Sequence, residues 1–150
     1  MSDVTLDVLL DEARITRVLS LYAASLDAHD WPALDDVFTE GAVADFQGIG
    51  RFDGRAAIVE LIRSVVAQVG ATQHLLGNFR IVVNGDRAHA KSYLQAIQAG
   101  KGSFVGSKMT VWGEYRDELE RTPAGWRIVY RELAGIHAEG DIGVAVSSSK

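Results

Sequence analysis

Cysteine is absent from the sequence, which excludes a disulfide framework, a thiolate nucleophile and a cysteine metal site. No run of apolar residues reaches the ~20 that a membrane-spanning helix needs. The first residues are acidic and polar rather than basic and then apolar, so a secretory signal peptide is not expected. These absences predict a soluble cytoplasmic protein without a membrane partner.

Positive charge is sparse and scattered: the net charge is −5, and the 15 lysines and arginines form no continuous basic stripe. Nucleic-acid binding is therefore not expected, because phosphate backbones are recognised by clustered cations. The sequence also lacks a glycine-rich phosphate loop, and its four histidines do not have the spacing of metal ligands. We therefore expect neither a metal nor a cofactor.

The length of 150 residues fits a single domain spanning residues 1–150, and its first half has the apolar spacing of helices. A first helix is predicted to end near Ala28, and Asp30 with Pro32 predicts a short second helix. A short strand is predicted over 42–46, before a third helix capped by Asp53 and closed by Gly70. The positions that define the apolar face of the first helix are Ile15, Val18, Leu19, Tyr22 and Leu26.

The second half has the alternation and turn residues of a strand meander. Strands are predicted over about 72–83, 88–98 and 107–119, with a last strand that begins at about Trp126. Asn84-Gly85 between the first two is a strong hairpin signal. Helices followed by antiparallel strands predict an α+β domain whose helices cover one face of a curved sheet. The concave face of such a sheet is either filled by side chains or encloses a pocket.

Two acid–base residues are candidates for chemistry, although the pattern alone favours ordinary structural roles for both. Asp27 lies at the predicted end of the first helix, where the helix dipole disfavours a negative charge. His74 lies in the first long strand, and alternation groups it with the more polar face, opposite Phe79 and Ile81. A solvated helix-end acid and a structural histidine are the ordinary interpretations.

Arg131 and Tyr22 are weaker candidates. Alternation places Arg131 on the face of Arg127 and Val129, without showing whether that face is concave, and its ordinary interpretation is an exposed arginine. Tyr22 lies a little over one helical turn before Asp27, so both can border one cavity, although Tyr22 fits core packing equally well. The other large aromatic residues expected in the core are Trp31, Tyr93, Trp112 and Trp126.

The pattern Tyr-x4-Asp-x2-Asp-Trp, which begins at Tyr22, and the stretches at 53–62 and 72–88 resemble the SnoaL-like family of the nuclear-transport-factor-2-like superfamily. The resemblance extends from about Asp11 to Gly135. It implies a cone-shaped α+β barrel, in which a curved, mainly antiparallel sheet and the N-terminal helices enclose an apolar pocket.

Within that family the chain looks most like the branch of scytalone dehydratase, bile-acid dehydratase and hexachlorocyclohexane dehydrochlorinase. The resemblance implies that Asp27 hydrogen-bonds His74, and that Arg131, five residues after Trp126, and Tyr22 also belong to the catalytic site. The second histidine or aspartate that some dehydratases place deeper in the sheet has no clear counterpart near residues 92–98.

The function implied is a cofactor-independent lyase. Neutral His74 would remove a proton from a small hydrophobic, aromatic or polycyclic substrate, Asp27 would orient the imidazole, and β-elimination would follow. An isomerase or polyketide-type cyclase with the same base is one alternative. A domain that binds a small ligand without catalysis is another, because fold alone does not give function. The partners expected are copies of the chain itself, as a trimer or a dimer.

Overall fold

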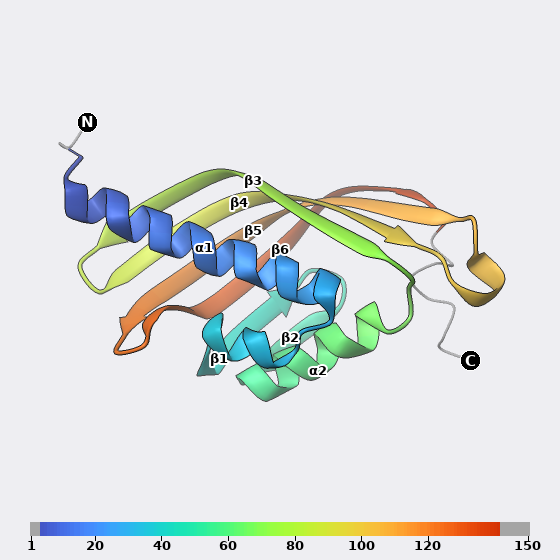
Figure 1. The fold of residues 1–150 in the computed structure, drawn as a ribbon, viewed down its shortest axis with the longest axis horizontal. Helices are drawn as coiled ribbons and strands as arrows, with labels where there is room; N and C mark the ends of the chain where they lie inside the picture. The colour runs from blue at the N-terminus through green and yellow to red at the C-terminus, as the bar shows by residue number, and fades with distance from the viewer. Residues whose placement is uncertain (1–3, 142–150) are drawn as a thin grey trace.

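Two helices lie on one face of a six-stranded curved sheet in the computed structural model, which describes residues 4–141 (Figure 1). The helices are α1 (Leu6–Ala28) and α2 (Arg55–Val66). The strands are β1 (Phe38–Phe46), β2 (Gly50–Asp53), β3 (Thr72–Asn84), β4 (Arg87–Ala99), β5 (Lys108–Thr122) and β6 (Gly125–Gly140). The predicted α+β class, with the helices before the meander and on one face of the sheet, is confirmed.

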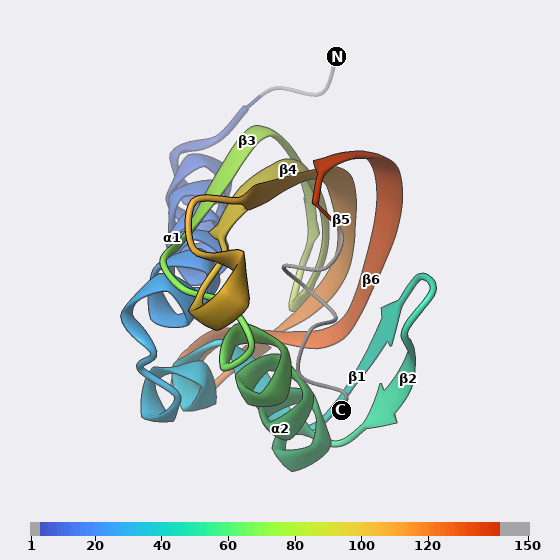
Figure 2. The ribbon, with the colours of Figure 1, turned by 90° about the vertical axis from the view of Figure 1, so that its right-hand side faces the viewer.

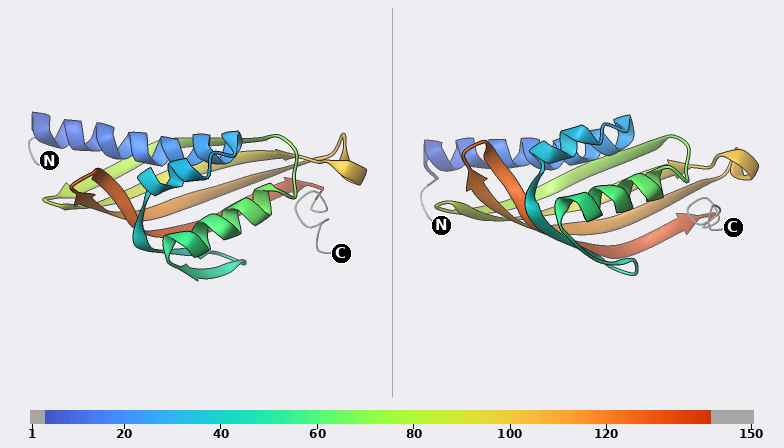
Figure 3. Two further views of the ribbon diagram at one scale, coloured as in Figure 1. Left: turned by 60° about the horizontal axis from the view of Figure 1, so that its bottom comes forward. Right: turned by 90° about the horizontal axis from the view of Figure 1, so that it is seen from below.

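The strands follow the order β2-β1-β6-β5-β4-β3, so β2 and β3 form the two edges of a sheet that does not close. Neighbouring strands are antiparallel except β1 and β6, which run parallel. Figure 2 shows how the long strands curl around the interior, and Figure 3 shows α1 running along the sheet with α2 near the short β1–β2 hairpin. The helices therefore cover the concave side and the gap between the sheet edges.

Local signals explain the ends of α1. The Thr5 side chain caps its N-terminus by accepting a hydrogen bond from the Val8 amide at 3.3 Å. At the other end His29 adopts a left-handed conformation, with φ 55°, and its N–H bonds back to the last turn. The prediction that this helix ends near Ala28 is correct. The short second helix is a 3-10 helix, Pro32–Asp36, whose entry is held by Asp30 Oδ1 accepting from the Ala33 amide.

The predicted start of the third helix is wrong. Asp53 is the last residue of β2 and contacts Arg51 at 3.2 Å instead of capping a helix. Gly54 directly precedes α2, which therefore has no side-chain cap. Its φ is 94°, and only a glycine readily adopts this conformation between a strand and a helix. The helix also ends at Val66, before Gly70.

A bulge in β3 decides which face His74 occupies. The pairing of β3 with β4 shifts between Gly77 and Arg80, and Asn78 between them has a left-handed φ of 49°. His74 lies before this irregularity and Phe79 after it, yet both are partly buried on the inner face. The predicted placement of His74 opposite Phe79 is therefore wrong, because strict alternation does not hold across a bulge.

A second bulge, in β6, decides which face Arg131 occupies. Glu118 pairs with Tyr130 while the next residue of β5 pairs with Ile128, which leaves Val129 without a partner. Ile128 and Arg131, on the two sides of the bulge, are both completely buried. Arg131 is therefore an interior residue, and the expectation that it is exposed on the face of Val129 is wrong.

Candidate functional site

Asp27 and His74 form a direct contact where the end of α1 meets the start of β3. Asp27 Oδ1 lies 2.7 Å from His74 Nδ1 and accepts a hydrogen bond from Thr72 Oγ1 at 2.8 Å. Asp27 Oδ2 accepts a hydrogen bond from the backbone N–H of His74 at 3.0 Å. The carboxylate, which the helix dipole disfavours at this end of α1, is thus compensated by three donors from one strand.

This contact fixes the orientation of the imidazole. A carboxylate at Nδ1 favours the neutral tautomer with the proton on Nδ1, which leaves the lone pair on Nε2. The side chain of His74 is 8% exposed and that of Asp27 is 25% exposed. The arrangement can therefore take up a proton at Nε2 and stabilise the resulting cation through Asp27.

His74 lines an apolar cavity of about 240 Å³ that lies between the helices and the concave face of the sheet. Tyr22 from α1 and Tyr115 from β5 also line it, and Gln98 adds an amide from β4. The rest of the wall is apolar; examples from five elements are Leu26, Phe46, Ile62, Leu94 and Leu133. A base in such a wall has little contact with water, which favours proton abstraction from a carbon acid.

Arg131 lies behind this cavity rather than in its wall. Its Nε and Nη2 donate to the two carboxylate oxygens of Asp117 at 2.7 and 2.8 Å, and both side chains are completely buried. The guanidinium carbon lies 4.1 Å from the ring centre of Tyr22 and 4.0 Å from that of Tyr115. The cation is thus separated from the cavity by two aromatic rings that stabilise it.

The two tyrosines pack edge to face, with ring centres 5.7 Å apart. Burial raises the pKa of the Tyr22 phenol above its usual value, while the charge of Arg131 acts in the opposite direction. Burial raises the pKa of Tyr115 further, and Arg131 again opposes the shift. Both phenols are therefore protonated at neutral pH and can donate a hydrogen bond.

The structure brings His74 and Tyr22 into the wall of one cavity, with Asp27 in contact with His74, and places Arg131 behind that wall. Thr72, Tyr115 and Asp117 were not predicted as site residues. Alternation along β5 could have placed Tyr115 and Asp117 on one face, and an acid on an inner face would have suggested a buried partner.

Groups that could hold a metal ion, with at least three histidine, aspartate or glutamate side chains, do not occur within residues 4–141. Over the same residues, neither helix combines the length and the apolar character needed to cross a membrane.

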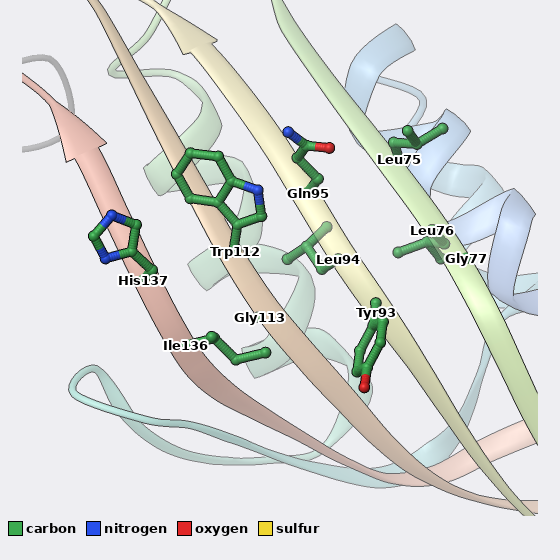
Figure 4. Close-up of a pocket in the computed structure, with 10 residues that line it drawn as sticks. All are labelled: Leu75, Leu76, Gly77, Tyr93, Leu94, Gln95, Trp112, Gly113, Ile136 and His137. Atoms are coloured by element: carbon green, nitrogen blue, oxygen red, sulfur yellow. The ribbon is translucent and has the colours of Figure 1, made fainter.

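A second hollow, of about 610 Å³, lies on the opposite face of the sheet (Figure 4). Side chains from four strands line it, including Leu75, Tyr93, Trp112 and His137. Tyr93 is 44% exposed there, so the expectation that it packs in the core is wrong. Trp126 is buried in the core as expected. The sheet therefore has an apolar depression on each face, and His74 belongs to the inner one.

Comparison with known proteins identifies the family. Residues 7–132 match the SnoaL-like domain. The uncharacterized protein Rv2910c of Mycobacterium tuberculosis is 33% identical over 127 residues, which cover 81% of this chain and 82% of the relative. A crystal structure from Novosphingobium aromaticivorans, provisionally assigned as an aromatic ring hydroxylase, is 30% identical with a TM-score of 0.82 and covers 91% of this chain and 97% of that one.

Two more distant structures share the fold. The hexachlorocyclohexane dehydrochlorinase LinA-type3 of Novosphingobium barchaimii is 19% identical with a TM-score of 0.81, covering 93% of this chain and 95% of that one. A protein of Novosphingobium aromaticivorans provisionally assigned as a scytalone dehydratase is 21% identical with a TM-score of 0.77, covering 87% of both chains. The matched domain spans most of the described fold, and the chain belongs to the SnoaL-like family of the nuclear-transport-factor-2-like superfamily.

Proposed function

We propose that this protein is a cofactor-independent lyase in which His74 is the general base. The observation that carries the proposal is the 2.7 Å contact between Asp27 Oδ1 and His74 Nδ1 beside an apolar cavity. An oriented, water-shielded imidazole of this kind is suited to removing a proton from a carbon.

In the proposed reaction, neutral His74 removes the proton from a carbon next to an electron-withdrawing group, and the proton binds to Nε2. Asp27 holds the ring in position and stabilises the imidazolium that forms. The electron pair left on the carbon then expels a leaving group from the neighbouring carbon. The imidazolium returns its proton to a leaving hydroxide, so that water is released and the base is restored.

The structural neighbours support this class of reaction only through the fold. The names of two of them, a dehydrochlorinase and a provisional scytalone dehydratase, denote eliminations of hydrogen chloride and of water. Family members thus include enzymes that use this fold for elimination from small hydrophobic substrates. The substrate proposed here is accordingly small and apolar, in keeping with a cavity of about 240 Å³.

The proposal is tested by a panel of small β-hydroxy carbonyl compounds, with products identified by mass spectrometry. We expect His74→Ala to lower turnover by about 10²–10⁴-fold, the usual contribution of general base catalysis, and Asp27→Asn to lower it strongly as well. His89→Ala is the matched control, because His89 lies in β4 with its side chain 64% exposed. Full turnover by both site variants would exclude His74 as the base.

The same experiment separates the alternatives. A product lighter by one water molecule supports a dehydratase, whereas a product of unchanged mass indicates an isomerase or a cyclase that uses the same base. Saturable binding without turnover of any compound would indicate a ligand-binding domain, which the apolar cavity also permits.

A further inference from the structure

Thr72 contributes a side chain to the contact between α1 and β3 without belonging to the cavity wall. Its hydroxyl donates a hydrogen bond of 2.8 Å to Asp27 Oδ1, the same oxygen that lies 2.7 Å from His74 Nδ1. Among the described residues, those that line the cavity include His74 but not Thr72. Thr72 is therefore placed to act on the proposed base through Asp27 rather than on a substrate.

We propose that Thr72 is a positioning residue for the general base, because its hydroxyl holds the Asp27 carboxylate at the ring nitrogen of His74. This inference rests on the proposed function and adds a residue to the machinery of that same site. The proposed reaction is unchanged by it. No bond to Thr72 forms or breaks, and the hydroxyl keeps its proton throughout.

The three donors around Asp27 fix the plane of its carboxylate. Two of them, the imidazole and the backbone N–H, belong to His74, so Thr72 supplies the one donor of the three that does not come from the base itself. Thr72 and His74 lie two residues apart before the bulge in β3, so alternation puts both side chains on one face. Because a β-branched side chain has few χ1 rotamers, the Thr72 hydroxyl is directed at Asp27 with a small loss of side-chain entropy.

The Thr72 hydroxyl matters for the geometry of the carboxylate more than for its charge. The Asp27 side chain is 25% exposed, so water can replace the hydroxyl as a donor when that hydroxyl is removed. A water molecule withdraws about as much charge from Oδ1 as a hydroxyl does, but it does not hold the carboxylate in one orientation. Without Thr72 the carboxylate can turn towards solvent, and the imidazole then loses the partner that keeps its proton on Nδ1.

The test compares Thr72→Val, which removes the hydroxyl and keeps the branched shape, with Thr72→Ser, which keeps the hydroxyl. Proton NMR of the substrate-free protein follows the Nδ1–H of His74, whose signal is identified by its absence from His74→Ala. We expect this proton to be protected from exchange with water in wild type and in Thr72→Ser, and its signal to be lost in Thr72→Val. Thr110→Val is the matched control, because Thr110 also lies in a strand but lines a hollow on the outer face with Trp112.

Turnover of the compound that the β-hydroxy carbonyl panel identifies is the second measurement. We expect Thr72→Val to lower kcat by about tenfold or more, the usual effect of losing a hydrogen bond to a charged group. KM should stay unchanged, because Thr72 lies outside the described cavity wall. Thr72→Ser should restore most of kcat, since it returns the donor to Asp27.

Thermal unfolding shows whether each variant is folded, and Thr72→Ala is a second hydroxyl-free variant should valine not be accommodated. The inference is overturned if the folded hydroxyl-free variant keeps the Nδ1–H signal, keeps the wild-type kcat, or changes KM instead of kcat. These results are distinguishable from failure of the proposed function. Full turnover in His74→Ala excludes His74 as the base, whereas the NMR comparison still decides whether Thr72 positions its ring.

Discussion

At the scale of single residues, two acids on α1 connect this helix to strands that are distant in the sequence. Asp27 contacts the start of β3, and Asp11 binds Arg121 through two hydrogen bonds of 2.8 and 2.9 Å. Asp11 also accepts a hydrogen bond from the indole of Trp126 at 3.1 Å. The two carboxylates hold opposite ends of the helix against the sheet, and Asp27 does so through His74, a residue of the cavity wall.

The carboxylate of Asp11 makes the stability of the fold dependent on pH. The hydrogen bond from Arg121 is the main cause that holds the pKa of Asp11 far below its usual value, against the opposing effect of burial. Because the folded pKa is lower than the unfolded value of about 3.9, the stabilisation is present above that pH and is lost as the pH falls through the folded pKa.

We therefore expect Asp11→Asn to lower the free energy of unfolding at pH 7 by about 1–3 kcal/mol, since hydrogen bonds to a charged group are lost. The difference from wild type should shrink as the pH falls below about 4. Urea denaturation at several pH values measures this difference in the free energy of unfolding. A difference that stays constant over the whole range would show that the charge of Asp11 does not contribute.

The residues of the site were predictable only in part. Helical spacing placed Tyr22 and Asp27 on α1, and the family resemblance supplied the partner His74, whose contact with Asp27 the structure contains. Arg131 was predicted as a site residue, but its burial behind two tyrosines was not predicted. No local pattern shows that two side chains from other elements cover it.

At the scale of elements, the helices were easier to predict than the faces of the strands. The apolar period and the turn residues of α1 act locally, so they are readable in the sequence. The faces of β3 and β6 depend on bulges at Asn78 and Val129, and a bulge is set by pairing with a neighbouring strand. One extra residue reverses every later side chain, which is why alternation separated His74 from Phe79 and grouped Arg131 with Val129.

The bulge at Asn78 can be tested directly. Asn78→Val should destabilise the fold by about 1–2 kcal/mol, because a β-branched residue is strained in the left-handed conformation, whereas Asn78→Gly should be tolerated. Gln73→Val is the matched control, since Gln73 is also exposed on β3 but lies in its regular part. Chemical denaturation measures the free energy of unfolding of all three variants. Equal stability of the two valine variants would show that the left-handed φ at Asn78 does not restrict which residue fits there.

At the scale of the whole molecule, the two helices leave the outer face of the sheet bare. Leu75 and Ile136 on this face are 61% and 63% exposed, beside the half-exposed Tyr93 and the hollow in Figure 4. Contiguous apolar surface of this kind is uncommon on soluble monomers. The association of the chain with its own copies is still a prediction. We propose this exposed apolar face as the interface.

We expect sedimentation velocity to show a dimer or a trimer, and the double variant Leu75→Glu/Ile136→Glu to sediment as a monomer, because charges would be placed in an apolar interface. Val4→Glu is the control, since Val4 is 65% exposed but lies before α1. A wild-type monomer, or a double variant that assembles as the wild type does, would contradict this.

The Asp27–His74 contact has a consequence for how the site can be observed. β3 is an edge strand, and the amide of His74 donates to the Asp27 carboxylate instead of to another strand. Its hydrogen-exchange rate thus reports whether the end of α1 is docked, without any substrate or turnover. A single backbone amide becomes a spectroscopic probe of the same carboxylate that orients the proposed base, so opening of the site can be followed separately from unfolding of the core.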